Sequence, residues 1–260
     1  MRTIIVPLDF SEISYNAAEF AAEMFYHRPD VNVVLYNHAE NEDESSTAQN
    51  LLDSLKAQLS KKLFNIETKV DTGSNFIDKL SAFADERKTH LIIMGLTGKT
   101  PLKQRFSGHN TLKMTEKNIC PVLVVPAYAK YKKIENVLIA SEMKSVEESA
   151  ALATVKKVLD EYRPNVHILN VDSSHYISIT EDFKKERDKM EALLSEYNPQ
   201  FYFMRLFDFH ESVNMFAKDK AIDMIIIAPK HHSFFTKLFK VQHTKALIYQ
   251  SEVPVLTVQD

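Results

Sequence analysis

The sequence predicts an α/β fold made of two tandem domains, each a doubly wound, five-stranded parallel sheet with the strand order 3-2-1-4-5. Strand-like and helix-like segments alternate strictly along the first half of the chain, which is typical of parallel strands joined by crossover helices. Several of these strands are almost continuously apolar, as expected when helices cover both faces of a sheet. The same order of segments then begins again in the second half.

The first half contains five expected strands and the helices that connect them. The strands cover residues 3–9, 32–39, 66–71, 90–95 and 121–126. The helices cover residues 14–27, 48–63, 76–86 and 109–118. The acidic, serine-rich segment NEDESSTAQN precedes the second helix, and we expect it to be a loop in which Ser46 or Thr47 caps that helix.

One constant offset in residue number relates the two halves of the chain. It places Asn37 on Asn170 and Pro121 on Pro254, and it brings four strands of one half onto four strands of the other. A constant offset of this kind indicates two copies of one unit, whereas a single large sheet would not need it. We expect a first domain at 1–128 and a second at 134–260, packed as an internal pseudo-dimer, with a further homodimer left open.

The composition excludes several classes of protein. The chain has 260 residues, 45% of them hydrophobic and 26% charged, and a net charge of −3, which gives no overall attraction to nucleic acid. We expect no membrane association, because no apolar run approaches the length of a membrane span or of a signal-peptide core. The single cysteine, Cys120, excludes an internal disulfide, so we expect a cytoplasmic protein in which Cys120 is a buried apolar residue.

Three of the four glycines follow the fourth expected strand, at Gly95, Gly98 and Gly108. The constant offset places other residues at these positions in the second half: Ala228, His231 and Val241. The second copy therefore keeps the length of the segment without its glycines. We infer that the fold does not require these glycines and that a ligand approaches the backbone of the first copy.

The ligand site is expected at the carboxyl ends of the strands. In an open parallel sheet, ligands bind where the strand order reverses, here between the first strand, which ends at Asp9, and the fourth, which ends at Gly95. Gly108 opens the following helix, whose free N–H groups favour an anion such as a phosphate. Lys99, Lys103 and Arg105 lie between the glycines, where such residues are more often part of a solvated loop.

These residues resemble the universal stress protein family, and the resemblance covers both halves. Nucleotide-binding members carry glycine, two residues, glycine, nine residues and glycine after the fourth strand, followed by serine or threonine. Gly95, Gly98 and Gly108 match that spacing, and VPLDFSE resembles the end of the family's first strand. The resemblance implies that the first half binds ATP, with or without Mg, through Pro7, Leu8, Asp9, His38, Met94, Gly95, Thr97, Gly98, Gly108, His109, Asn110 and Thr111.

By the same resemblance, Asp9 reaches the ribose and adenine region, the backbone around Asn37 and His38 contacts adenine, and Met94 lines the pocket. The chain departs from the family pattern at His109, where nucleotide binders have serine or threonine. The second half has Glu142 at the position of Asp9 and no glycines, so we expect no cofactor there.

The resemblance implies an ATP-binding regulatory protein of the stress response, which acts through protein partners that the sequence does not identify. Asp9 is the only carboxylate placed in the crevice and no metal-ligand set is recognisable, so we expect no catalytic residues, no metal site and at most slow hydrolysis of ATP. The alternative is an interaction scaffold that binds no nucleotide, in which the glycine segment is vestigial and His109 marks the loss of the site.

Overall fold

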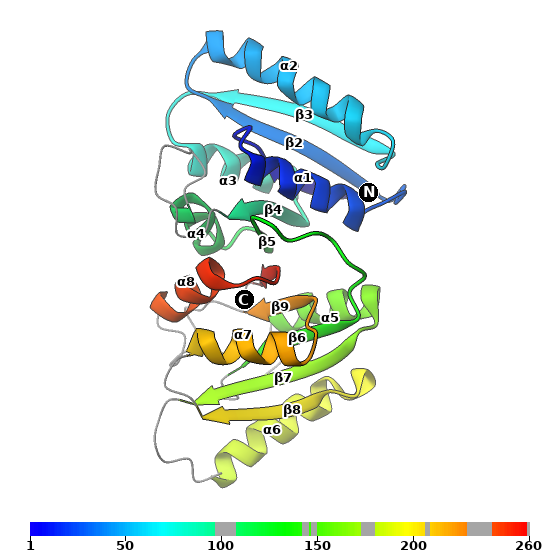
Figure 1. Ribbon diagram of the computed structural model, residues 1–260, viewed down its shortest axis with the longest axis vertical. Coiled ribbons are helices and arrows are strands. Elements are labelled where there is room, and N and C mark those ends of the chain that lie inside the picture. Colours follow the sequence, from blue (N-terminus) through cyan, green and yellow to red (C-terminus); the bar gives the residue numbers. More distant parts are fainter. Residues whose placement is uncertain are drawn as a thin grey trace. The chain divides into compact units, whose positions relative to one another are not determined.

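The computed structural model describes residues 1–96, 108–141, 146, 150–172, 180–205, 209–227 and 241–258. The chain divides into two compact units, Met1–Lys132 and Lys133–Asp260. Each unit is described by itself below, and Figure 1 colours the chain from the first to the second.

The first unit is a five-stranded parallel sheet in the order β3-β2-β1-β4-β5. Its strands are β1 (Arg2–Pro7), β2 (Val31–Ala39), β3 (Asn65–Thr72), β4 (Leu91–Leu96) and β5 (Val122–Pro126). Its helices are α1 (Glu12–Met24), α2 (Glu42–Leu59), α3 (Phe76–Glu86) and α4 (Gly108–Glu116). Right-handed crossovers place α1 and α2 on one face of this sheet and α3 and α4 on the other. The packing agrees, because α2 contacts β2 and β3 while α3 and α4 contact each other.

The second unit repeats this order as β8-β7-β6-β9-β10. Its strands are β6 (Asn136–Ala140), β7 (Asn165–Asp172), β8 (Gln200–Arg205), β9 (Met224–Ile227) and β10 (Val255–Thr257). Its helices are α5 (Ala150–Tyr162), α6 (Glu181–Leu193), the short 3-10 helix η1 (Ser195–Tyr197), α7 (Phe209–Asp219) and α8 (Val241–Gln250). Numbered within each unit, both sheets have the order 3-2-1-4-5, so the predicted fold class is confirmed.

The constant offset between the halves recurs in the hydrogen bonds of the two sheets. The backbone N–H of Ile92 donates to the Pro121 carbonyl at 3.0 Å, and that of Ile225 donates to the Pro254 carbonyl at 2.9 Å. The apolar cores of the units also correspond, because Leu35 and Ile168, which the same offset pairs, are both fully buried. The same local sequence pattern therefore builds the same arrangement of strands and core residues in both units, and we call this arrangement the shared frame.

The segment that follows β5 packs on the first unit. Asn16 of α1 donates from Nδ2 to the Ala129 carbonyl at 3.0 Å and accepts from Lys130 Nζ at 2.7 Å. The Tyr131 ring packs edge-on against Phe20, with centroids 5.5 Å apart. These contacts attach residues 129–131 to α1.

Helix α2 begins earlier than the sequence analysis expected, so the expected acidic loop is wrong. Its cap is Asn41, whose side chain accepts from the Glu44 N–H at 2.9 Å, and neither Ser46 nor Thr47 serves as cap. Glu42, Asp43 and Glu44 fill the first turn, where carboxylates interact favourably with the positive end of the helix dipole. The acidic run is therefore a helix start.

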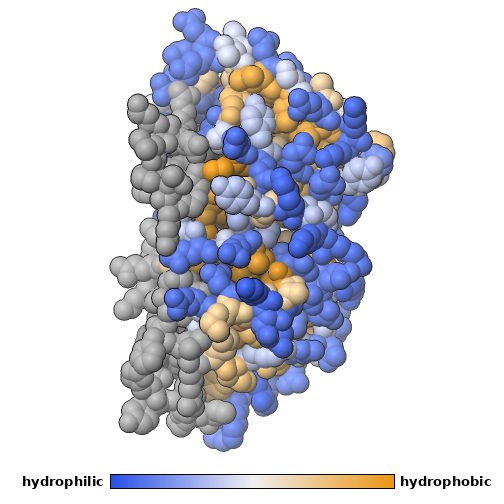
Figure 2. All heavy atoms as spheres, viewed as in Figure 1, coloured by the Kyte–Doolittle hydropathy of each residue, from blue (hydrophilic) through white to orange (hydrophobic). Residues whose placement is uncertain are grey.

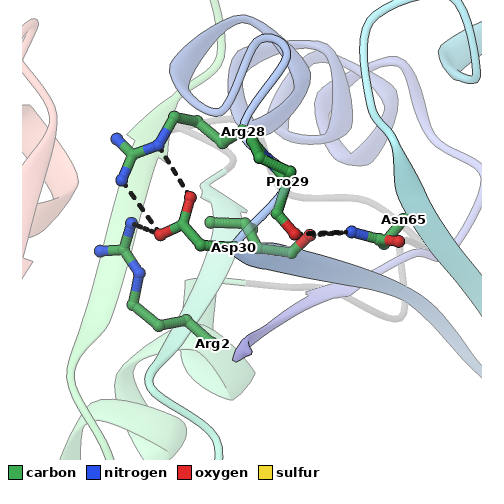
Figure 3. Close-up of polar contacts among 6 residues, drawn as sticks. Arg2, Arg28, Pro29, Asp30 and Asn65 are labelled. Carbon is green, nitrogen blue, oxygen red and sulfur yellow. Dashed lines mark hydrogen bonds and ion pairs between the residues drawn. The ribbon is translucent and has the colours of Figure 1, made fainter.

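At the amino edge of the first sheet, Asp30 joins the starts of β1 and β2 (Figure 3). It accepts from Arg28 Nε at 3.0 Å and from Arg2 Nη2 at 2.9 Å, and the hydrogen bond from Arg28 is the main cause that lowers the pKa of Asp30 to about 2. Asn65, which begins β3, donates to the Pro29 carbonyl at 3.0 Å. These contacts align the first three strands at the edge opposite the site described below.

The face of the molecule in Figure 2 is largely hydrophilic, with hydrophobic residues visible in patches between the polar ones. Within the described ranges, no helix has both the length and the apolar composition that crossing a bilayer requires.

Candidate functional site

A cleft of about 940 Å³ opens at the carboxyl edge of the first sheet. It is lined by residues 8–11 after β1, by residues 37–40 at the end of β2, and by residues 73–76 between β3 and α3. One side of α2, from Asp43 to Leu51, and Asn110 of α4 complete the lining. Its volume lies in the range of small-molecule sites, roughly 300–1,000 Å³.

Four residues named by the sequence analysis line this cleft: Leu8, Asp9, His38 and Asn110. They come from the ends of β1 and β2 and from the first turn of α4, so segments far apart in the sequence meet at one site. Asn37, which the sequence analysis placed near adenine, lines it too. The described part of the cleft lies over β1, β2 and β3, whereas the sequence analysis expected a crevice between the first and fourth strands.

Asp9 is held by the start of α1. Its Oδ1 accepts from the Ser11 hydroxyl at 2.6 Å and from the Ser11 N–H at 3.0 Å. Ser11 in turn caps α1 by accepting from the Ser14 N–H at 3.3 Å. The carboxylate is thus fixed at the edge of the cleft by the helix cap that follows it.

Asn37 joins the ends of β1 and β2 inside the unit. Its Nδ2 donates to the Leu8 carbonyl at 2.7 Å, beside the bond from the Leu8 N–H to the Tyr36 carbonyl, also 2.7 Å long. The second unit has the same bridge, since Asn170 Nδ2 donates to the Ser141 carbonyl at 3.0 Å. This buried amide is part of the shared frame and also positions the backbone just before Asp9.

The cleft has an aromatic and apolar lining on its β2 and α3 sides. The ring of His38 meets Phe76 nearly edge-on, with centroids 6.0 Å apart. Leu8, Ala39 and Ala48, all buried, add apolar surface. A planar ring system fits such a lining better than a strongly hydrated group does.

Gly95 corrects the interpretation of the glycines. A Cβ atom at this position would lie 2.6 Å from the carbonyl oxygen of Ile13 and 2.7 Å from its Cγ2, closer than real contacts allow. Gly95 is therefore required where α1 crosses β4, so the inference that the fold needs none of these glycines is wrong for it. Its counterpart Ala228 lies outside the described residues.

The remaining predicted residues are divided between the core and the undescribed part of the chain. Pro7 is buried in β1 and Met94 is 1% exposed in β4, and neither lines the cleft. Thr111 is fully buried, and its hydroxyl donates to the Gly95 carbonyl at 3.2 Å, so this hydroxyl joins α4 to β4. Thr97 and Gly98 lie outside the described residues.

Helix α4 begins at Gly108, as the glycine pattern predicted, and His109 belongs to its first turn. The side chain of His109 is outside the described part of the structure. Asn110, next along the helix, lines the cleft, so the amino end of α4 is at the site. The start of a helix is the positive end of its dipole, which favours an anion.

The sequence analysis missed the contribution of α2 and of residues 73–76 to the cleft. Asp43, Glu44 and Thr47 belong to the segment expected to be a loop, and Gly73 is the one glycine that the analysis left unexplained. Gly73 has φ of +111°, a conformation open to glycine and strained for other residues. A glycine directly after a parallel strand was the signal that would have placed this turn at the ligand-binding edge.

The described part of the cleft is acidic. Asp9, Glu40, Asp43 and Glu44 line it, and no lysine or arginine does so within the described residues. Glu44 Oε2 accepts from the Glu40 N–H at 3.2 Å, so one of these carboxylates also completes the capping of α2. The acidic lining repels phosphate groups and other anions.

Two chemical possibilities find no support in the described ranges. No group of three or more histidine, cysteine or carboxylate side chains there is placed to hold a metal ion. Cys120 is 4% exposed, and burial raises the pKa of its thiol to about 12, so the thiol stays protonated and unreactive. Cys120 is a buried apolar residue, as the sequence analysis predicted.

Comparison with known proteins agrees with this architecture. Residues 1–126 match the model of the universal stress protein family. A universal stress protein of Methanocaldococcus jannaschii is 30% identical over 139 residues, which cover 48% of this chain and 81% of that protein. The crystal structure of a universal stress protein from Archaeoglobus fulgidus superposes with a TM-score of 0.71 and 14% identity, over 99% of this chain and 98% of that one.

A putative universal stress protein from Pseudomonas aeruginosa gives a TM-score of 0.66 at 14% identity, over 100% of this chain and 93% of that one. At such low identity these two structures show the fold alone. The archaeal relative matches over most of its length, and the family model covers the unit that holds the cleft. The chain therefore belongs to the universal stress protein family.

Proposed function

We propose that the first unit binds an adenine nucleotide, ATP with or without Mg, and that the protein is a regulator of the stress response. The observation that carries the proposal is the cleft at the carboxyl edge of the sheet, lined by Asp9, His38 and Asn110. These residues come from three separate elements, and each was predicted from the sequence before the cleft was considered. Parallel α/β sheets bind nucleotides at this edge.

The charges of the cleft favour one orientation of the nucleotide. Adenosine lies over the ends of β1 and β2, where the Asp9 carboxylate accepts hydrogen bonds from ribose hydroxyls and apolar side chains contact the base. Asp9, Asp43 and Glu44 repel phosphates from that end. The phosphates therefore extend toward the amino end of α4, which is the positive end of that helix dipole.

The role we propose is binding and not catalysis. Hydrolysis of ATP needs a positioned base or a metal beside the phosphates. Asp9, the carboxylate nearest the predicted ribose site, is already engaged by Ser11. We expect hydrolysis to be absent or slow, and we expect the nucleotide to act by changing how the protein meets its protein partners.

A scaffold that binds no nucleotide is the second candidate. The observation that favours it is Gly95, whose lack of a side chain is explained by the close approach of Ile13 without any ligand. Under this alternative, the glycine spacing is partly a packing requirement and His109 closes the site.

Titration calorimetry of the full chain with ATP·Mg decides between the two. We expect one ATP per chain, because the second half lacks the glycines, and adenine nucleotide in the mass spectrum of ligand released from fresh protein. Gly108→Val, which introduces the residue of the second half, is expected to abolish binding because its side chain crowds the phosphates. The melting temperature of the empty protein should change little.

Val241→Gly, the reciprocal exchange in the second unit, is the matched control and should leave binding unchanged. Absence of ATP binding by the unaltered chain would support the scaffold. Normal ATP binding by Gly108→Val would show that the phosphates do not lie at the amino end of α4. Cross-linking between the halves at high dilution tests the expected internal pseudo-dimer.

A further inference from the structure

The core of the second unit contains a buried histidine that the proposed function does not use. His167 lies in the middle of β7 and is 6% exposed. Its register partners are Leu138 on β6 and Gln200 on β8. Under the constant offset between the halves, the corresponding residue of the first unit is Val34, which is fully buried in β2. An apolar position of one unit is thus a titratable position of the other.

One ring nitrogen of His167 lies beside a hydrogen-bond partner. The Tyr202 hydroxyl donates to Gln200 Oε1 at 2.5 Å, so its oxygen can accept from His167 Nδ1, which lies 3.3 Å away. Nε2 is buried and has no hydrogen-bond partner within the described residues.

A second proton would be costly in this environment. It would add an N–H donor at Nε2, which faces no acceptor in the described structure, and a charge inside an apolar core. The ring packs against Phe216 of α7 and Tyr202 of β8, with centroids 6.1 Å and 5.6 Å away. The residue opposite on β6, Leu138, is apolar and fully buried.

The charged group that acts on the ring is a cation. Lys220, which follows α7, places its ammonium 5.6 Å from the centre of the Tyr202 ring. Burial, and to a smaller extent the charge of Lys220, lower the pKa of His167 below 6.5. Lys220 is itself paired with Asp219, whose Oδ2 lies 3.3 Å from the Lys220 ammonium. Within the described residues, none of the contacts of the His167 ring itself brings a carboxylate.

We propose that His167 makes the second unit a proton-triggered switch, which loosens in mild acid. The half that lacks the nucleotide motif then has a regulatory role of its own, as the acid-responsive half of the chain. This role does not depend on nucleotide binding by the first unit.

The direction of the pH effect follows from linkage. Above about pH 6.5, the ring is neutral in both the folded and the opened unit, so it gives no pH dependence. Below that pH, the opened unit binds a proton that the folded unit does not. The ratio of folded to opened unit therefore falls by up to about tenfold for each pH unit, until the lowered pKa of the folded state is reached.

Hydrogen exchange of the full chain, followed by mass spectrometry between pH 7.5 and 5.0, tests this proposal. After correction for intrinsic exchange, protection of β7 should fall by up to about tenfold per pH unit below 6.5. His167→Val, which introduces the residue of the first unit, should flatten the response of β7. His167→Leu, nearer in volume to imidazole, should do the same if Val leaves a cavity.

His27→Leu, which removes an exposed histidine of the first unit, is the control and should leave the response of β7 unchanged. An unaltered acid response of β7 in both His167 variants would overturn the proposal. A flattened response confined to the His167 variants would establish it.

Discussion

The two units of the chain build one frame around different cores. Phe83 of α3 and Phe216 of α7 occupy corresponding positions under the constant offset and face the same side of their sheets. In the first unit, the Phe83 ring stacks on Tyr36 of β2, with centroids 5.5 Å apart. In the second, Phe216 instead meets the rings of Tyr202 and His167, at 4.8 and 6.1 Å. The frame therefore tolerates different aromatic neighbours at this position.

This difference separates the residues that make the fold from those that make each unit distinct. Asn37 and Asn170 make the same buried hydrogen bond in both units, so the bridge between the first two strands belongs to the frame. Asp9 and the glycine segment belong to the first half alone, and the buried imidazole of His167 belongs to the second. Substitutions at positions that correspond under the offset test which residues serve the shared fold and which serve one unit alone.

The largest effect is expected at Gly95. Gly95→Ala places a Cβ atom 2.6 Å from the Ile13 carbonyl, so α1 must move away from β4. Overpacking of this kind destabilises proteins by roughly 1–3 kcal/mol, and we expect a loss of about 3 kcal/mol because the clash is with backbone. Denaturant unfolding of the nucleotide-free protein, with hydrogen exchange to assign the unit, measures it.

The reciprocal change, Ala228→Gly, is the control and should cost at most about 1 kcal/mol. If Gly95→Ala left the free energy of unfolding unchanged and abolished only ATP binding, Gly95 would serve a ligand and not the packing of α1.

An intermediate effect is expected from the two buried amides. Asn37→Ala and Asn170→Ala each remove one hydrogen bond to a buried carbonyl, so each should lower the stability of its own unit by about 1–2 kcal/mol. Only Asn37→Ala shifts the backbone before Asp9. We expect it to weaken ATP binding by about tenfold, with no change for Asn170→Ala, as measured by calorimetry. Equal affinities of the two variants would place the nucleotide elsewhere.

The fold was predictable because its signals are local and occur twice. Apolar strands, amphipathic helices and the constant offset between the halves give the strand order of each unit without knowledge of any side-chain contact. The carboxyl edge was predictable for the same reason, because parallel strands bring their carboxyl ends together. Leu8, Asp9, His38 and Asn110 line the cleft. The strand order predicted Asp9 at this edge, whereas the resemblance to the family implied His38.

What the sequence did not reveal depends on contacts between distant segments. Whether Gly95 serves a ligand or a helix depends on how closely the Ile13 backbone approaches, which no spacing of residues encodes. The α2 side of the cleft was missed because an acidic, serine-rich run is equally compatible with a loop and with a capped helix start. Asn41, one residue before the run of carboxylates, caps the first turn of α2, so the run is helical.

The smallest effect is expected at the caps of two corresponding helices, α2 and α6. Asn41→Ala and Thr180→Ala each remove a side-chain acceptor, for the Glu44 and Phe183 N–H groups respectively, and each should cost about 1 kcal/mol. Helix α2 buries four residues, whereas α6 buries only Met190, and its surface ion pairs contribute little. We therefore expect Asn41→Ala to raise exchange only in the first turn of α2, and Thr180→Ala to raise it about fivefold along all of α6. An increase confined to the first turn of α6 would mean that this helix is held by more than its one buried side chain.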